Sequence, residues 1–183
     1  AFLANPAQRV LRISLELLSF EHNAREVVAN AVGRYLLGLA RQGRFIANPV
    51  VTLLDEAHQF LDKSVGDEFS KTDLDAFGLI AKEGRKYSLT CVLATQRPRD
   101  IPEEVLSQMG MFIVHRLINE RDRNVVEKAC GDLDASAATF LPTLGQGEAM
   151  VVGVSSPMPL PVAINRPARP PSSRSADYEN LWG

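Results

Sequence analysis

Two adjacent carboxylates, Asp55 and Glu56, directly follow the apolar run 50–54. An enzyme that hydrolyses nucleoside triphosphates places such a pair at the exposed end of a buried strand. There the first carboxylate holds the Mg²⁺ shell, and the second orients the water that attacks the γ-phosphate. Two surface acids that close a strand fit the bare pattern equally well, so the pair indicates nucleotide chemistry only in the company of further residues.

The usual partner of this pair is a glycine-rich loop, G-x-x-x-x-G-K-[ST], whose backbone cradles the phosphates. The 183 residues do not contain it, because none of the 12 glycines is followed by lysine. We expect the loop to lie earlier in the same polypeptide, which makes this chain the C-terminal part of the enzyme and inactive on its own. A first residue that is alanine rather than methionine agrees with that expectation.

Gln96 and Arg85 are the next candidates. Gln96 follows the apolar run 89–94, and a polar side chain at the end of a neighbouring strand can contact the γ-phosphate, because an amide both donates and accepts. A polar loop residue before Pro98 is the alternative. Arg85 can reach a neighbouring subunit's nucleotide as an arginine finger, or it can simply belong to a solvated helix end.

Two lysines follow Asp55 and Glu56 in an acidic, polar stretch, 57–75, that we expect to hold a loop. Lys63 and Lys71 stand where a ring could present a channel loop to DNA phosphates. Solvation of the loop is the favoured interpretation, because acids surround both lysines. The three histidines and two cysteines show no zinc-ligand spacing.

Strands and helices are expected to alternate. The predicted strands are 9–15, 50–54, 89–94, 111–114, 149–154 and 160–164, and the predicted helices are 21–42, 74–86, a short one from Pro102, and 122–129. Alternation predicts an α/β fold, a mostly parallel sheet with flanking helices, and the last two strands predict a C-terminal β-hairpin. Ligands of such sheets bind at the carboxyl ends of the strands, which is where Asp55, Glu56 and Gln96 fall.

Three details of these elements can be checked. A stripe at helical spacing is expected to face the core of the first helix: Ala24, Val28, Ala31, Tyr35 and Leu39. The run 89–94 is almost wholly apolar, which is typical of a strand covered on both faces. Asp73 is expected to cap the helix 74–86, and Phe77, Ile80 and Ala81 are expected to point inward.

Composition is that of an ordinary soluble domain, with 45% hydrophobic and 23% charged residues. A net charge of −2 provides no overall basic field, so contact with DNA requires a local patch. No run approaches the roughly 20 apolar residues that span a bilayer, and no signal peptide is evident, so we expect a cytoplasmic protein with two reduced cysteines and no membrane partner. Residues 1–165 are expected to form one domain, and 166–183 an extended tail rich in Pro, Ser and Arg.

Four motifs in this order resemble the HerA branch of the HerA/FtsK ATPases: Asp-Glu-Ala-His from Asp55, Glu-Gly-Arg-Lys-Tyr from Glu83, Ala-Thr-Gln-Arg-Pro from Ala94, and Leu-Pro-Thr-Leu-Gly-Gln-Gly-Glu-Ala from Leu141. The likeness runs from about residue 9 to residue 164, and the combination is specific although each motif alone is not. The resemblance implies a RecA-like P-loop NTPase core, with ATP and Mg²⁺ as cofactors. It also implies a hexameric ring that pumps double-stranded DNA through its channel.

Carried over by motif, the resemblance implies Asp55 for the metal shell, Glu56 for catalysis, Gln96 for sensing and Arg85 for the finger in trans. The first hypothesis is therefore the ATP-hydrolysing part of a DNA translocase or helicase, acting with a nuclease or other effector in DNA processing or phage defence. The second is an ATPase of the secretion or conjugation type. The third is a non-catalytic module that assembles a ring.

Overall fold

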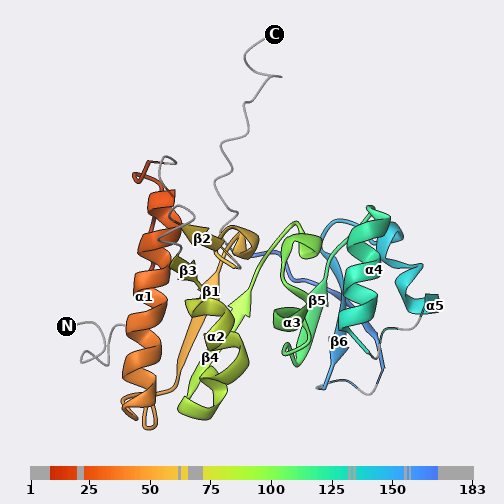
Figure 1. Cartoon of the computed structure of the whole chain (residues 1–183). Coiled ribbons are helices and arrows are strands. Elements are labelled where there is room, and N and C mark those ends of the chain that lie inside the picture. The colour runs from red at the N-terminus through yellow and green to blue at the C-terminus, as the bar shows by residue number, and fades with distance from the viewer. Residues whose placement is uncertain are drawn as a thin grey trace. The chain divides into compact units, whose positions relative to one another are not determined.

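The computed structural model describes residues 9–19, 23–61, 63–65, 72–131, 133, 135–154, 156 and 158–168. The chain divides into two compact units, residues 1–109 and 110–183 (Figure 1). The boundary expected at residue 165 stays a prediction, and residues 169–183 of the expected tail lie outside the described part. None of the described helices is both long enough and apolar enough to span a bilayer.

The first unit contains a parallel pair of strands. β1 (Val50–Leu54) and β4 (Leu89–Leu93) run side by side, with Val50 opposite Leu89 and Leu54 opposite Leu93. Parallel neighbours need a long crossover connection, and here residues 55–88 provide it. The parallel pairing confirms the prediction from alternating elements, and β1 has the bounds expected from its apolar run.

Two helices pack together in the first unit: α1 (Ala24–Arg41) and α2 (Ala76–Glu83), the latter continued by the 3-10 helix η4 (Gly84–Tyr87) (Figure 1). The prediction for the core face of α1 is wrong. Its buried residues are Gly33, Leu37 and Ala40, whereas Tyr35 is 66% exposed. The reason is steric: a Cβ on Gly33 would lie 2.9 Å from the Cβ of Ala76, so the contact with α2 requires the smallest residue and not the largest apolar ones.

The sheet of β1 and β4 is covered on one face only by the described residues. Leu54 and Leu89 are buried on the covered face. On the other face Val51 is 63%, Leu53 66% and Val92 43% exposed, and the register places Leu53 opposite Val92. The prediction that the 89–94 strand is covered on both faces is therefore wrong for this chain, although its composition is the kind that two-sided burial requires.

Two further expectations about the first unit are wrong, and one stretch contains more regular structure than was expected. Residues 9–15 form no strand, because alternation alone supplies no partner to pair with. A short antiparallel ladder of β2 (Lys63–Val65) and β3 (Thr72–Leu74) occupies part of the stretch expected to be a loop. Asp73 lies within β3, so it cannot cap α2, which begins two residues beyond Leu74.

Other details agree with expectation. Phe77 and Ile80 are buried in α2, and Ala81 is half-buried. A short helix, α3 (Glu103–Leu106), begins directly after Pro102. Cys91 and Cys130 form no disulfide, and they are half-buried and buried respectively.

The second unit is built on an antiparallel sheet in the order β5-β6-β7, formed by β5 (Met111–Val114), β6 (Glu148–Gly153) and β7 (Leu160–Ala163). The 111–114 strand was expected in the parallel sheet, but it pairs antiparallel with β6. β6 and β7 also pair antiparallel, as the expected hairpin requires, while Ser155 and Pro157 of its turn lie outside the described residues. The core of this unit gathers Val114, Val126, Leu141, Met150 and Val152.

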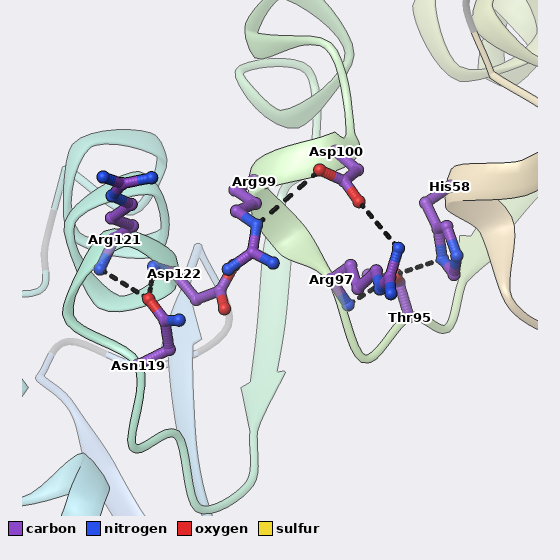
Figure 2. Close-up of polar contacts among 8 residues, drawn as sticks. All are labelled: His58, Thr95, Arg97, Arg99, Asp100, Asn119, Arg121 and Asp122. Carbon is purple, nitrogen blue, oxygen red and sulfur yellow. Dashed lines mark hydrogen bonds and ion pairs between the residues drawn. The ribbon is translucent and has the colours of Figure 1, made fainter.

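Helix α4 (Glu120–Ala129) covers part of that core, and the short α5 (Ala135–Ala138) follows it. The Asn119 side chain begins α4 by accepting hydrogen bonds from the N–H groups of Arg121, at 2.9 Å, and Asp122, at 3.4 Å (Figure 2). Such a cap satisfies amide groups that have no partner within the helix. The described part of the chain is therefore mixed α/β, with one parallel and three antiparallel strand pairs.

Candidate functional site

The candidate site lies at the carboxyl ends of β1 and β4, which reach the same edge of the sheet because the strands are parallel. Two backbone hydrogen bonds continue the pairing past the strands: the Ala94 N–H donates to the Leu54 carbonyl at 2.8 Å, and the Ala57 N–H donates to the Ala94 carbonyl at 2.9 Å. The turn that carries Asp55 and Glu56 is thereby fixed beside the turn that carries Gln96. The predicted convergence of these turns at one edge is confirmed.

Glu56 has a left-handed backbone conformation, with φ 49° and ψ 48°. This conformation costs a non-glycine residue about 1 kcal/mol, and such strain gathers at functional sites. The Glu56 N–H donates to the Oδ1 of Asp55 at 3.1 Å, so the first carboxylate supports the turn that presents the second.

The Glu56 side chain is 37% exposed, but its Oε2 atom is buried and has no hydrogen-bond partner among the described residues. The Nδ1 of His58 lies 3.4 Å from this oxygen. At that distance the contact is electrostatic attraction to any proton on Nδ1, and not a well-formed hydrogen bond. An unsatisfied buried acceptor costs about 1–3 kcal/mol, which is unusual enough in a folded protein to require a functional or structural reason.

His58 also contacts the other turn. Its Nδ1 lies 3.1 Å from the Oγ1 of Thr95, and the same Oγ1 accepts a hydrogen bond from the Arg97 N–H at 3.0 Å (Figure 2). Asp100 forms ion pairs with Arg97 at 3.6 Å and Arg99 at 3.8 Å. These exposed pairs add little stability, whereas the His58–Thr95 contact is half-buried and joins the two strand ends.

Asp55 and Gln96 are exposed at this edge. The described residues contain no group of three or more His, Cys, Asp or Glu side chains placed to hold a metal ion by themselves. The exposed carboxylate of Asp55 has the chemistry of a Mg²⁺ ligand, because Mg²⁺ keeps several waters and binds through one or two carboxylates together with substrate phosphates. Asp55 would be the protein's contribution to that shell.

Arg85 lies at the opposite end of β4 from Gln96. It belongs to η4, which ends just before Leu89 begins the strand, and its side chain is exposed. A strand of five residues spans about 16 Å, so within one chain Arg85 does not join Asp55 and Glu56. Gly84 beside it has no room for a side chain, since a Cβ there would lie 2.5 Å from the Leu89 carbonyl oxygen.

The structure does not place the side chain of either lysine that was predicted to contact DNA. The backbone of Lys63 begins β2, and Lys71 lies outside the described residues. A cavity of about 490 Å³ lies elsewhere in the first unit, beside β3, α2 and α3, and it contains none of the predicted site residues.

Sequence reasoning assigned no role at the site to His58 or Thr95, although Thr95 precedes Gln96 at the same strand end. The sequence contained a clue to both residues. His58 stands in the motif of Asp55 and Glu56, Thr95 stands in the motif of Gln96, and each motif follows an apolar strand run. His58 was considered only as a metal ligand. Its contact with Thr95 depends on the parallel register and on the left-handed turn at Glu56, and neither is visible in residue types alone.

Comparison with known proteins gives one family. The family model described as helicase HerA-like C-terminal matches residues 36–179, more than half of the chain. The DNA double-strand break repair helicase HerA of Pyrococcus furiosus is 35% identical over 119 residues, which are 65% of this chain and 21% of that protein. The protein of the same name from Sulfurisphaera tokodaii is 29% identical over 157 residues, which are 83% of this chain and 31% of that protein. The chain thus spans roughly a fifth to a third of the length of these relatives.

Solved structures with a similar fold include the genome packaging NTPase B204 of Sulfolobus turreted icosahedral virus 2 in complex with AMPPCP. The likeness covers 75% of this chain and 63% of that chain, with a TM-score of 0.58 and 18% identity. The DNA-packaging ATPase B204 of Sulfolobus turreted icosahedral virus gives the same TM-score over 81% of this chain and 65% of that chain, also at 18% identity. At this identity the likeness concerns the fold alone.

Proposed function

Because the chain belongs to the helicase HerA-like C-terminal family, we propose that it is the ATP-hydrolysing part of a DNA-translocating motor. One observation carries the proposal within the chain. Asp55, Glu56 and Gln96 share one sheet edge, and Glu56 is held there in a strained conformation with an unsatisfied carboxylate oxygen. Buried acceptors without a hydrogen bond are rare in folded proteins, so this one supports a functional role for Glu56.

In the proposed reaction the chain's own residues have distinct tasks. Glu56 orients the attacking water and accepts its proton, and Asp55 contributes a carboxylate to the Mg²⁺ shell. When bound, Mg²⁺ neutralises charge on the phosphates. The Gln96 amide donates a hydrogen bond to the γ-phosphate. When this phosphate is lost, Gln96 loses its acceptor and the turn after β4 can change position. The phosphate-binding loop would come from residues outside these 183, and we propose that the 183-residue chain alone does not turn over ATP.

The proposed substrate of the motor is double-stranded DNA, and the proposed assembly is a homo-oligomeric ring, expected to be a hexamer. The names of the relatives, DNA double-strand break repair helicases, support DNA as the substrate. A nuclease or other effector as partner, Lys63 and Lys71 as DNA contacts, and a cytoplasmic location belong to the same proposal.

Arg85 fits a role in trans. It is exposed and lies a strand's length from Glu56 of its own chain, as an arginine that completes a neighbour's site must. In rings mixed from Arg85→Ala subunits and Glu56→Gln subunits, each interface that joins an intact Glu56 to an intact Arg85 is expected to recover hydrolysis. Mixed rings as inactive as both parents would contradict the role in trans.

The proposed function is tested by ATP hydrolysis of the full-length protein that its gene encodes, with and without duplex DNA. DNA is expected to stimulate turnover, and Glu56→Gln is expected to lower kcat at least about 100-fold while ATP still binds. Glu103→Gln, at an exposed glutamate of α3, is the matched control and should leave turnover unchanged.

Each other outcome has a definite meaning. Turnover without any response to DNA would favour a secretion or conjugation ATPase. Absence of ATP binding and turnover in the full-length protein would favour the ring-assembly module. An active Glu56→Gln protein would overturn the assignment of Glu56.

A further inference from the structure

His58 stands between two acceptors that belong to different strands. Its Nδ1 lies 3.1 Å from the Thr95 hydroxyl oxygen, after β4, and 3.4 Å from the buried Glu56 carboxylate oxygen, after β1 (Figure 2 shows the contact with Thr95). None of the described residues forms a hydrogen bond with that carboxylate oxygen, and the Nδ1 of His58 is the polar atom recorded near it. Side chains that follow β1 and β4 therefore both approach one atom, the Nδ1 of His58.

The proton on this nitrogen can be placed from its surroundings. A lone pair on Nδ1 would face the Glu56 carboxylate at 3.4 Å, which is repulsive, so the carboxylate favours an N–H at that position. Thr95 is compatible with this tautomer. Its Oγ1 has two lone pairs, one of which accepts from the Arg97 N–H at 3.0 Å, and the second remains for the Nδ1–H of His58.

One N–H cannot serve both acceptors with good geometry at once. In this structure it lies nearer to Thr95, and Glu56 Oε2 is left unsatisfied. A small shift of the Thr95–Arg97 turn would lengthen the first contact and free the N–H for Glu56. Because Gln96 is the middle residue of that turn, whatever moves Gln96 also changes the hydrogen bonding available to Glu56.

We propose that His58 is a positioning residue that couples the Glu56 carboxylate to the turn carrying Gln96, by donating its Nδ1–H either to Thr95 or to Glu56. This inference rests on the proposed function, in which Glu56 orients the attacking water and Gln96 contacts the γ-phosphate. It adds a direct route between the two groups within a single subunit.

The test uses the full-length protein and two pairs of variants. His58→Ala removes the shared donor and Thr95→Val removes one acceptor, and each is expected to lower kcat about tenfold with the KM for ATP changed less than about twofold. His58→Asn keeps an amide donor near the position of Nδ1, and Thr95→Ser keeps the hydroxyl, so both should recover most of the rate. Thr90→Val, at an exposed threonine within β4, is the matched control and should behave as the wild type.

The double variant His58→Ala/Thr95→Val distinguishes coupling from two independent defects. If the two residues act through one shared hydrogen bond, the double variant loses no more rate than either single variant. Losses that multiply, or a Thr95→Val protein with the wild-type kcat, would overturn the inference.

Hydrogen–deuterium exchange of the nucleotide-free protein provides a readout that does not depend on activity. Thr95→Val is expected to raise exchange in the segment 56–60, and His58→Ala is expected to raise exchange in the segment 95–98, each at least about twofold. Thr90→Val should raise neither. If the wild type hydrolyses no ATP, the proposed function fails, but the reciprocal change in exchange still shows whether His58 and Thr95 hold the two turns together. If hydrolysis is present and the reciprocal change is absent, the inference alone fails.

Discussion

The side-chain oxygen of Asn30, on α1, accepts a hydrogen bond of 3.0 Å from the backbone N–H of Ala76, the first residue of α2. Helix α2 thus receives its N-terminal cap from another helix. The residue in its own N-cap position, Asp75, makes no capping bond and instead forms an ion pair of 2.5 Å with Arg34 of α1. The hydrogen bond between Asn30 and Ala76 therefore both joins α1 to α2 and caps the N-terminus of α2.

Asn30→Ala is expected to lower the free energy of unfolding by about 1 kcal/mol, because it leaves an amide at the start of α2 without its cap. Asp75→Asn, which removes the charge from an exposed ion pair, is the control and should cost less than about 0.5 kcal/mol. Denaturant unfolding of both variants checks the difference. Equal losses would show that Asn30 does not act as the cap.

Gly33 and Gly38 of α1 form a matched pair for a second prediction. A Cβ on Gly33 would lie 2.9 Å from the Cβ of Ala76 and 3.2 Å from the Phe77 ring, whereas a Cβ on Gly38 would meet nothing within 4 Å. Gly38→Ala is expected to stabilise the helix by up to about 1 kcal/mol. Gly33→Ala gains the same propensity but forces α1 and α2 apart, so it should destabilise by about 1–3 kcal/mol. Opposite shifts in the unfolding midpoint check both.

Glu56→Gly tests whether the site stores backbone strain. Glycine adopts the left-handed conformation at φ 49° without steric cost, so the folded state should gain about 1 kcal/mol, partly offset by the greater chain entropy of unfolded glycine. The variant should unfold no more easily than the wild type and should not hydrolyse ATP. Glu56→Ala, which keeps the strain, is the comparison. A Glu56→Gly protein clearly less stable than Glu56→Ala would show that the turn is not strained.

Burial raises the pKa of Cys91 from 9.0 to about 11, although a hydrogen bond with Thr52 acts in the opposite direction. The thiolate is the reactive form, so at pH 8 alkylation of Cys91 should be about 100-fold slower in the folded protein than in urea. Mass spectrometry after iodoacetamide treatment measures both rates. The linkage has a definite sign: the unfolded chain deprotonates first, so stability is fully present below pH 9 and falls as the pH rises through 11. Fast alkylation of the folded protein would contradict the shift.

Local patterns predicted the parts of the fold that local sequence controls. The run 50–54, in which four of the five residues are aliphatic, lies between Pro49 and Asp55, so both ends of β1 were marked and its bounds were predicted correctly. Parallel pairing with β4 followed from the order of the elements, and this placed Asp55, Glu56 and Gln96 at one edge. The roles of these residues stay predictions until the variants above are measured.

The remaining features depend on contacts that residue types do not disclose. The core face of α1 was missed because the contact with α2 selects Gly33 for its lack of a side chain, while periodicity weights the large apolar residues such as Tyr35. β5 was assigned to the parallel sheet because it follows a helix, but its partner is β6, more than 30 residues later. The shared nitrogen of His58 needs the strand register and the turn at Glu56 together.

The exposed apolar face of β1 and β4 affects the solubility of the 183-residue chain. Val51, Leu53 and Val92 form an apolar surface on a two-stranded sheet, and such a surface promotes aggregation when nothing covers it. A recombinant preparation of these 183 residues is expected to require a solubilising fusion. Charged replacements at Leu53 are expected to improve the soluble yield of these 183 residues and to impair the proposed motor, so a screen for soluble expression would select against the proposed function.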